Sequence, residues 1–120
     1  MNGVIIDFNA FLGNYPFRRL KHNTPRDLLK LMDNVGVDKA LISRFEAIFY
    51  KDWIEADKML MEDIATLAKS ASKTTLTERL IPCITVNPNF PDWITDLEEH
   101  IRDFHAVRVY PNYHGYSLRD

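Results

Sequence analysis

The sequence predicts an α/β fold in which parallel strands alternate with helices along the chain. Short apolar runs rich in Val and Ile alternate with longer stretches in which apolar residues recur every three or four positions. The short runs are nearly continuous in apolar character, as in parallel strands that are covered on both faces. A length of 120 residues, with 46% hydrophobic and 27% charged residues, suits one domain over residues 1–120 with its own core.

Four segments have the length and composition of strands. Each is short and rich in β-branched and other apolar residues, which favour extended backbone. The four predicted strands are Gly3–Phe8, Lys39–Ser43, Leu80–Val86 and Ala106–Tyr110.

Start and stop signals delimit the first helix, which follows the first strand. Thr24 is placed to cap it, Pro25 to occupy its first position, and Gly36 to end it in the left-handed conformation. A second helix is predicted over about 52–72 and a third over about 92–104, from apolar residues three and four positions apart. The residues expected on the inward face of the third helix are Trp93, Leu97, Ile101 and Phe104.

Charge and composition exclude several classes of function. The 15 Lys and Arg against 17 Asp and Glu leave a formal net charge of -2 and provide no basic surface for nucleic acid. No apolar stretch approaches the roughly 18 residues of a membrane span, and the N-terminus lacks the basic segment of a secretory signal. Cys83, the single cysteine, stands in an apolar run and is expected to be a packed thiol in a reducing compartment. We therefore expect a cytoplasmic protein with no nucleic-acid or membrane partner.

Candidate site residues stand at the carboxyl ends of the first and fourth strands, where parallel α/β sheets carry their sites. Because side chains alternate along a strand, Asp7 and Asn9 share one face of the first, and Arg108 and Tyr110 share one face of the fourth. We expect these four polar side chains to point into a common interior. Arg108 would either pair with Asp7 or bind an anionic ligand, and the residues leave both open.

Two further candidates lie in loops that follow strands. His114 comes after the fourth strand, where Gly115 allows a tight turn, and it is a candidate acid, base or substrate contact. Arg18 belongs to a basic loop with Arg19, Lys21 and His22, which would close over an anionic substrate or, as we favour, remain solvated. The predicted substrate-binding residues are thus Asp7, Asn9, Arg108, Tyr110, His114 and Arg18.

Three segments resemble the first half of an amidohydrolase-related TIM barrel, the group of metal-dependent hydrolases and decarboxylases called the amidohydrolase 2 family. They are Ile5–Gly13, Leu31–Ile42, which ends a helix in Gly-x-Asp-Lys-Ala before a strand, and Pro88–Pro91. The resemblance covers essentially the whole chain. It implies parallel βα units that form about half of a (βα)8 barrel, with a pocket for a small molecule that is anionic or bears a carbonyl group.

The resemblance also implies that the metal site of this family is incomplete here. In the family the first strand ends in Asp-x-His-x-His, and both His residues bind a divalent metal such as zinc. The matching positions of this chain hold Asn9 and Phe11, and the remaining ligands of the family come from later strands. We therefore expect no metal or other cofactor on this chain and no efficient hydrolysis by the chain alone.

The last four residues, Ser117–Asp120, have the pattern of a capping box that opens a helix, which predicts that the chain is the front part of a longer barrel. Four barrel strands also leave two unpaired edges. We therefore expect a homo-oligomer, or a partner chain that supplies the missing strands.

Two alternatives to this hydrolase-like half barrel stay open. The chain is either a flat, flavodoxin-like binding or regulatory module, or a structural subunit completed by a partner chain. The strand order distinguishes the first of these, because a half barrel has the order 1-2-3-4 and a flavodoxin-like sheet has the order 2-1-3-4. The absence of a Gly-rich loop after the first strand argues against a phosphate-binding module.

Overall fold

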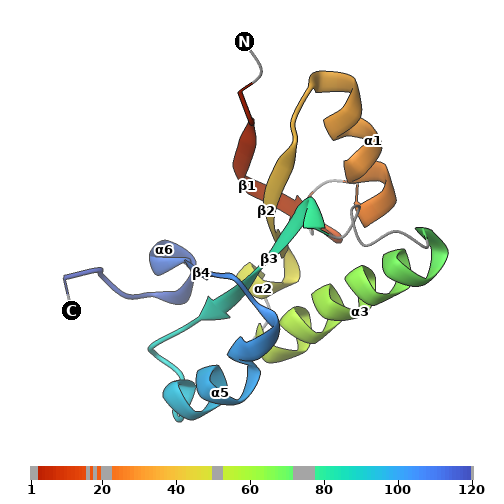
Figure 1. Ribbon diagram of the computed structural model, residues 1–120. Coiled ribbons are helices and arrows are strands. Elements are labelled where there is room, and N and C mark those ends of the chain that lie inside the picture. Colours follow the sequence, from red (N-terminus) through yellow and green to blue (C-terminus); the bar gives the residue numbers. More distant parts are fainter. Residues whose placement is uncertain are drawn as a thin grey trace.

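The computed structural model describes residues 3–15, 17, 19, 23–49, 53–71 and 78–119. Strands and helices alternate along the chain (Figure 1), and the second and fourth strands are followed by short helices that the sequence pattern does not predict. The elements are β1 (Ile6–Leu12), α1 (Pro25–Val35), β2 (Lys39–Arg44), α2 (Glu46–Phe49), α3 (Trp53–Ala71), β3 (Leu80–Val86), α5 (Trp93–His100), the 3-10 helix η1 (Ile101–Asp103), β4 (Ala106–Val109) and α6 (Pro111–His114).

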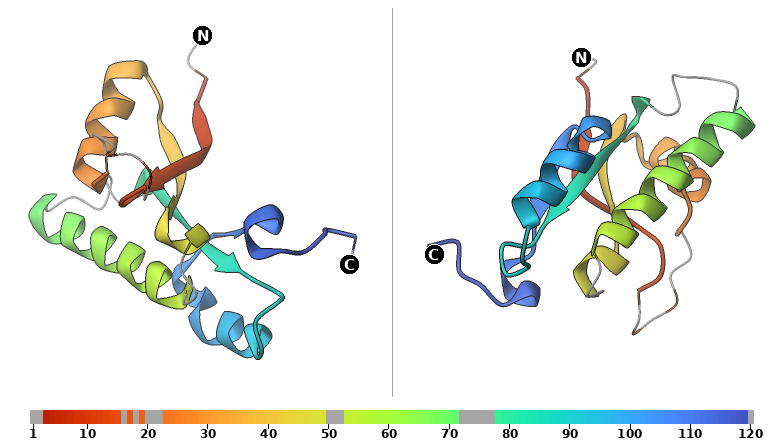
Figure 2. Two further views of the ribbon diagram at one scale, coloured as in Figure 1. Left: turned by 180° about the vertical axis from the view of Figure 1, so that it is seen from behind. Right: turned by 90° about the horizontal axis from the view of Figure 1, so that it is seen from below.

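All four strands run parallel, in the order β1-β2-β3-β4. The sheet is curled into half of a barrel, and the longer helices α1, α3 and α5 lie along its outer side (Figure 2). The predicted parallel α/β half barrel is therefore confirmed, and the flavodoxin-like order 2-1-3-4 is wrong. Among the helices that the structure describes, none is long and apolar enough to cross a bilayer.

Three of the four predicted strands lie within one residue of the observed bounds. β3 has the predicted range, β2 extends one residue further to Arg44, and β4 ends one residue earlier at Val109. The first strand is displaced, because it was predicted over Gly3–Phe8 and lies at Ile6–Leu12. Its carboxyl half is held by burial, since Ala10 and Leu12 pack into the core, whereas the residues before it are exposed.

A β-bulge interrupts β1. Asp7 pairs with Ala40 and Ala10 pairs with Ile42, so three steps along β1 match two steps along β2. A bulge disrupts the hydrogen-bond ladder locally and breaks the strict alternation of side chains. Faces assigned by alternation before the bulge therefore do not carry over to the residues after it.

Local signals place α1 as the sequence predicts. Thr24 Oγ1 accepts a hydrogen bond of 3.2 Å from Asp27 N, Pro25 stands in the first turn, and Gly36 ends the helix with φ of 79°. Each of these groups satisfies or removes a backbone group that the helix end leaves unpaired. Leu28, Leu29 and Met32 form the buried face of the helix, whereas Val35 near its end is exposed.

The predicted helix over 52–72 corresponds to α3, and residues 52 and 72 lie outside the described part of the chain. The predicted helix over 92–104 divides into α5 and η1. Of its expected inward face, Phe104 is buried, Leu97 is half-buried against the core, Trp93 is half-buried, and only Ile101 is exposed. An apolar stripe indicates which face a helix can bury, but burial also needs an element to cover that face.

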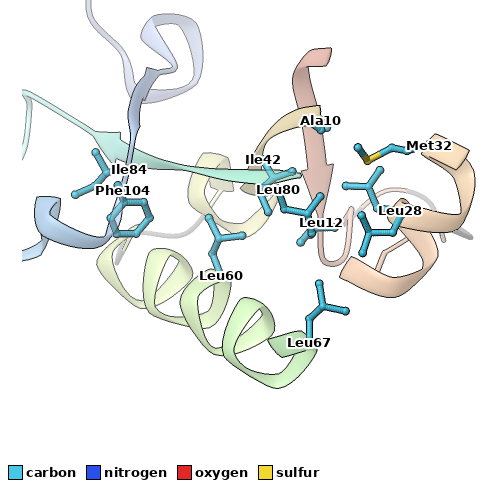
Figure 3. Close-up of a cluster of buried hydrophobic side chains, with 12 residues drawn as sticks. Ala10, Leu12, Leu28, Met32, Ile42, Leu60, Leu67, Leu80, Ile84 and Phe104 are labelled. Atoms are coloured by element: carbon cyan, nitrogen blue, oxygen red, sulfur yellow. The ribbon is translucent and has the colours of Figure 1, made fainter. Parts of the chain in front are cut away.

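The main core lies between the sheet and the helices α1 and α3, with Phe104 beside β3 (Figure 3). It contains side chains from the strands and from the helices that cover them, and these side chains are less than one-tenth exposed. Its residues are Ala10, Leu12, Leu28, Leu29, Met32, Ala40, Ile42, Leu60, Leu67, Leu80, Ile84 and Phe104.

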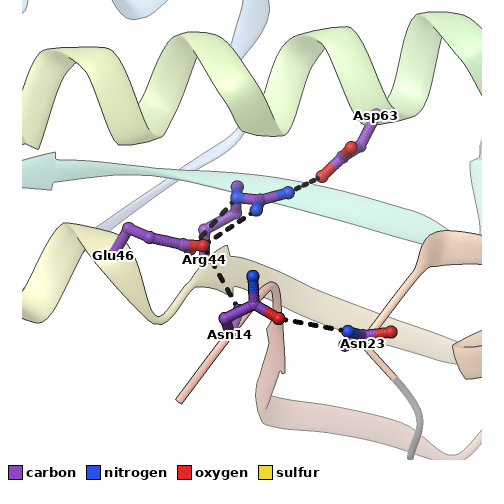
Figure 4. Close-up of polar contacts among 5 residues, drawn as sticks. All are labelled: Asn14, Asn23, Arg44, Glu46 and Asp63. Atoms are coloured by element: carbon purple, nitrogen blue, oxygen red, sulfur yellow. Dashed lines mark hydrogen bonds and ion pairs between the residues drawn. The ribbon is translucent and has the colours of Figure 1, made fainter. Parts of the chain in front are cut away.

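A buried ion cluster ties β2 to α2 and α3 on the same side of the sheet (Figure 4). The Arg44 guanidinium donates two hydrogen bonds to Glu46, of 2.9 and 3.1 Å, and pairs with Asp63 of α3. Glu46 also accepts a hydrogen bond from the backbone N–H of Asn14. Burial opposes the charge of Arg44, but its hydrogen bond to Glu46 and the charges of both acids raise its pKa, so the guanidinium stays charged.

Gly13 is required where β1 passes this cluster. Its φ of 83° lies in the left-handed region, and a Cβ there would sit 2.7 Å from Glu46 Oε1 and 2.9 Å from Arg44 Nη2. These acceptor and donor atoms are fixed by the ion pair and cannot retreat without breaking it. Gly13 therefore satisfies both a backbone and a packing requirement.

We expect Gly13→Ala to lower the free energy of unfolding by about 2–4 kcal/mol, because left-handed strain adds to overpacking. Gly36→Ala is the matched control, since Gly36 has φ of 79° but no atom within 4 Å of the added Cβ. It should cost only about 1 kcal/mol. Urea unfolding followed by circular dichroism measures both, and equal losses would show that the contacts with Glu46 and Arg44 do not matter.

Candidate functional site

The candidate site lies on the concave side of the sheet, at the carboxyl ends of the strands. Ser43 is the next-to-last residue of β2, Tyr110 follows β4, and His114 lies on α6, while Arg108 projects from β4 and Phe11 from β1. We call these five residues the carboxyl-edge cluster. The curl of the sheet brings together residues of β1, β2, β4 and α6, although β1 and β4 are the two outer strands of the sheet.

Arg108 spans the concave side from one edge of the sheet to the other. Its Nη1 donates to Ala10 O at 3.2 Å and to Ser43 Oγ at 3.0 Å, and its Nη2 donates to Phe8 O at 2.6 Å and to Leu41 O at 3.1 Å. In a flat sheet, three strand spacings would separate β4 from β1 by roughly 14 Å, too far for one side chain. The hydrogen bonds of Arg108 therefore need the curl and stabilise it.

The same guanidinium lies over the ring of Phe11, with 5.0 Å between its Cζ and the ring centroid. A cation over an aromatic face is attracted by the ring electrons. Of the five N–H groups of Arg108, the Nε–H alone has no recorded acceptor within the described residues. The site thus has a fixed positive charge.

Tyr110 and His114 have polar atoms that are shielded from solvent and have no hydrogen-bond partner among the residues that the structure describes. These atoms are Tyr110 Oη and His114 Nδ1, and the two rings meet edge to face at 5.5 Å. Burial raises the pKa of the Tyr110 phenol, against the influence of the neighbouring Ser43 hydroxyl and Arg108 guanidinium. The phenol is therefore a neutral hydrogen-bond donor.

The hydrogen bond of His114 Nε2 determines the tautomer of the ring. Nε2 lies 3.2 Å from Ala47 O, and because a carbonyl oxygen only accepts, Nε2 carries the hydrogen. In the neutral ring, Nδ1 is then an acceptor. The cluster consequently presents a donor at Tyr110 and an acceptor at His114.

Aromatic rings surround the cluster at this end of the sheet. Phe11 stacks on Phe45 at 4.8 Å, and further ring contacts connect Phe45 to Tyr15, Tyr15 to Phe49, and Phe49 to Tyr113. Most of these side chains are partly exposed, whereas Tyr110 is 9% exposed. The rings form an apolar wall beside the unpartnered polar atoms.

The other predicted site residues are placed differently. Asp7 and Asn9 are exposed, and Asp7 Oδ1 accepts a hydrogen bond from Asn9 N rather than pairing with Arg108. The ion pair considered for Arg108 and Asp7 is therefore not formed, because Arg108 is bound to main-chain oxygens and Ser43. Arg18, together with Lys21 and His22 of the same predicted basic loop, lies outside the described residues.

A metal does not fit the positions that the resemblance singles out. Phe11 is stacked between Phe45 and the Arg108 guanidinium, and Asn9 is exposed. In the described ranges, no group of three or more His, Cys, Asp or Glu side chains is placed to hold a metal ion. The positive charge of this interior comes from Arg108 instead.

Sequence reasoning missed a buried acid near the cluster, Asp57 of α3. It is 4% exposed and accepts two hydrogen bonds of 3.0 Å from Thr85, at the backbone N–H and the hydroxyl. Recorded pairing between β2 and β3 stops at Ile42 and Pro82, so Asp57 supplies the acceptor that β2 no longer offers. Its position between Trp53 and Leu60 on the apolar stripe of the helix was a signal in the sequence that Asp57 is buried.

Comparisons of the chain with protein-family models, with curated proteins and with solved structures find no match. The functional assignment therefore depends on the fold and on the geometry of the carboxyl-edge cluster.

The pKa of Asp57 predicts a pH dependence of stability. Burial raises it from 3.8 to about 7, although the hydrogen bonds from Thr85 lower it. The folded protein therefore keeps a proton that the unfolded chain loses above about pH 4, and the free energy of unfolding should fall as the pH rises from about 4 to 7. Asp57→Asn should remove this loss, so that its stability relative to wild type increases by roughly 3–4 kcal/mol over the interval.

Urea unfolding at several pH values between 4.5 and 8 measures this difference. Glu98→Gln is the control, because Glu98 is exposed on α5 and should leave the slope unchanged. An Asp57→Asn slope that matches the wild-type slope would contradict the assignment.

We expect Arg108→Met to lower the free energy of unfolding by about 3 kcal/mol or more, because it leaves main-chain acceptors on two strands without their donor. Arg108→Lys should recover little, since one ammonium group cannot reach four separated oxygens. Arg102→Met is the control, because Arg102 is exposed on η1 and should change stability by less than about 0.5 kcal/mol. Urea unfolding compares the three variants, and a small loss for Arg108→Met would show that the curl forms without it.

Proposed function

We propose that this chain is half of an amidohydrolase-type barrel whose carboxyl-edge cluster binds a small molecule bearing a carbonyl or carboxylate group. One observation carries the proposal. Within the described part of the chain, Tyr110 Oη and His114 Nδ1 are buried without hydrogen-bond partners, and the Arg108 cation lies beside Tyr110. Buried polar groups are nearly always satisfied in folded proteins. A ligand that supplies the missing partners removes the cost of leaving these groups unpaired.

The cluster defines the chemistry of this ligand. Tyr110 offers a donor, and the charge of Arg108 favours an electron-rich oxygen, so the ligand needs a carbonyl or carboxylate oxygen. His114 Nδ1 offers an acceptor, so a hydroxyl or amide N–H on the same ligand is favoured. The surrounding rings favour a compact ligand with an apolar part.

Binding without hydrolysis is the activity proposed for the chain alone. The two positions that the resemblance assigns to metal ligands hold Asn9 and Phe11, and the latter is engaged with Arg108 and Phe45. In a complete barrel, the residues that activate water would come from strands beyond β4. The half barrel described here contributes binding and orientation.

Titration with sodium propionate, a carboxylate probe, and propionamide, a carbonyl probe, tests the proposal. We expect saturable NMR shifts at Tyr110 with both probes, and at His114 with propionamide, whose amide N–H can donate to Nδ1. The cationic Arg108 should favour propionate at Tyr110. Tyr110→Phe should weaken binding about three- to tenfold, the effect of losing one neutral hydrogen bond.

Tyr113→Phe is the matched control, because Tyr113 is 64% exposed and loses the same hydroxyl from the neighbouring helix. Tyr113→Phe should leave the affinity for propionate and propionamide unchanged. Shifts that do not saturate, or an equal effect of both substitutions, would contradict the proposed site.

A further inference from the structure

Within the residues that the structure describes, both edges of the sheet offer backbone groups that no neighbouring strand uses. β2 and β3 are inner strands, whereas β1 and β4 each have one neighbour. His105 N donates to Pro82 O, so alternation turns the backbone N–H groups of Ala106 and Arg108 away from β3. Such an edge is a template for another strand.

Apolar side chains accompany both edges. Ile5 and Phe8 are 56% and 69% exposed on the β1 side, and Val107 and Val109 are 53% and 39% exposed on β4. Neither strand contains Lys or Pro, which often protect edge strands from pairing. The exposed apolar residues and the free backbone groups therefore coincide on the same two strands.

We propose that two copies of this chain close one eight-stranded parallel barrel, with β4 of each copy paired to β1 of the other. All pairs within the chain are parallel, so a strand added in the same sense continues the sheet at either edge. Four strands span half of a barrel. A two-fold rotation about the barrel axis forms both seams at once, a seam being the line along which β4 of one copy pairs with β1 of the other. This arrangement leaves no strand edge unpaired.

The curl selects a second copy over an open-ended series of copies. Arg108 holds β4 within reach of β1, and at this curvature the ring closes after two copies rather than extending as a ribbon. The two carboxyl-edge clusters then lie at the same end of one barrel. Each copy completes the interior of the other, independently of which ligand that interior binds.

Light scattering of the full chain at micromolar concentration tests the proposal. We expect a mass of two 14.0 kDa chains. Ala106→Pro removes an N–H that faces the open edge and leaves the ladder to β3 intact, so it should give a folded monomer by circular dichroism. Ile94→Lys is the control, because Ile94 is 54% exposed on α5, away from the seams, and should leave the dimer intact.

Cross-linking gives a second measurement that does not depend on the folding of the proline variant. Under mild oxidation, a mixture of Asp7→Cys and Val107→Cys copies should form a disulfide-linked dimer, whereas each variant alone should not. Asp7 pairs with Ala40 and Val107 pairs with Ile84, and both partners belong to the core, so the two thiols lie on the same face of the sheet. These seams join β1 to β4, so only unlike copies bring the two thiols together.

Three outcomes would overturn the proposal. The first is a wild-type monomer, including one that pairs only with a different chain supplying the missing strands. The second is a dimer that Ile94→Lys dissociates and Ala106→Pro does not, which would place the interface on α5. The third is cross-linking of Val107→Cys alone, which would indicate antiparallel pairing between two β4 strands.

Discussion

The curl of the sheet depends on the hydrogen bonds that Arg108 makes across the concave side. One guanidinium from the last strand holds carbonyls of the first and second strands together with the hydroxyl of Ser43. On the opposite side, Arg44 connects β2 to α2 and α3 through Glu46 and Asp63. The sheet is thus fixed by one arginine on each face, and each is almost fully occupied by oxygen acceptors.

The bulge in β1 explains why Arg108 finds main-chain acceptors. Two of its three main-chain acceptors, Phe8 O and Leu41 O, lie between the pairs Asp7–Ala40 and Ala10–Ile42, where the bulge disrupts the ladder. The position of the bulge also turns Phe11 beneath the guanidinium.

The sequence predicted elements that are set by neighbouring residues better than elements that are set by distant contacts. The cap at Thr24 and the end at Gly36 involve neighbours in sequence, so α1 was predicted correctly. The displacement of β1 follows from a bulge and from packing against α1, which no local pattern encodes. The apolar stripe of α5 predicted burial, and β3 and the core cover it only in part, so Leu97 packs against the core and stays half-buried.

The candidate site shows the same division. The rule that sites lie at carboxyl ends of strands led to Arg108, Tyr110 and His114, whereas the acceptors of Arg108 were unpredictable because three of them are main-chain carbonyls. Asp57 was missed although it interrupts an apolar stripe, since periodicity alone does not say which polar residue is buried.

The contact between Arg108 and Phe8 joins positions 100 residues apart, and this separation affects how the chain acquires its shape during synthesis. At about 5–20 residues per second, the ribosome needs roughly 5–20 s to make the intervening segment. During that time β1 lacks the donor that holds it in the curled sheet, and its exposed Phe8 is available to other chains or to chaperones. The sheet therefore reaches its final curvature late in the synthesis of the chain. Slowing translation would prolong the interval in which the first strand is prone to aggregation.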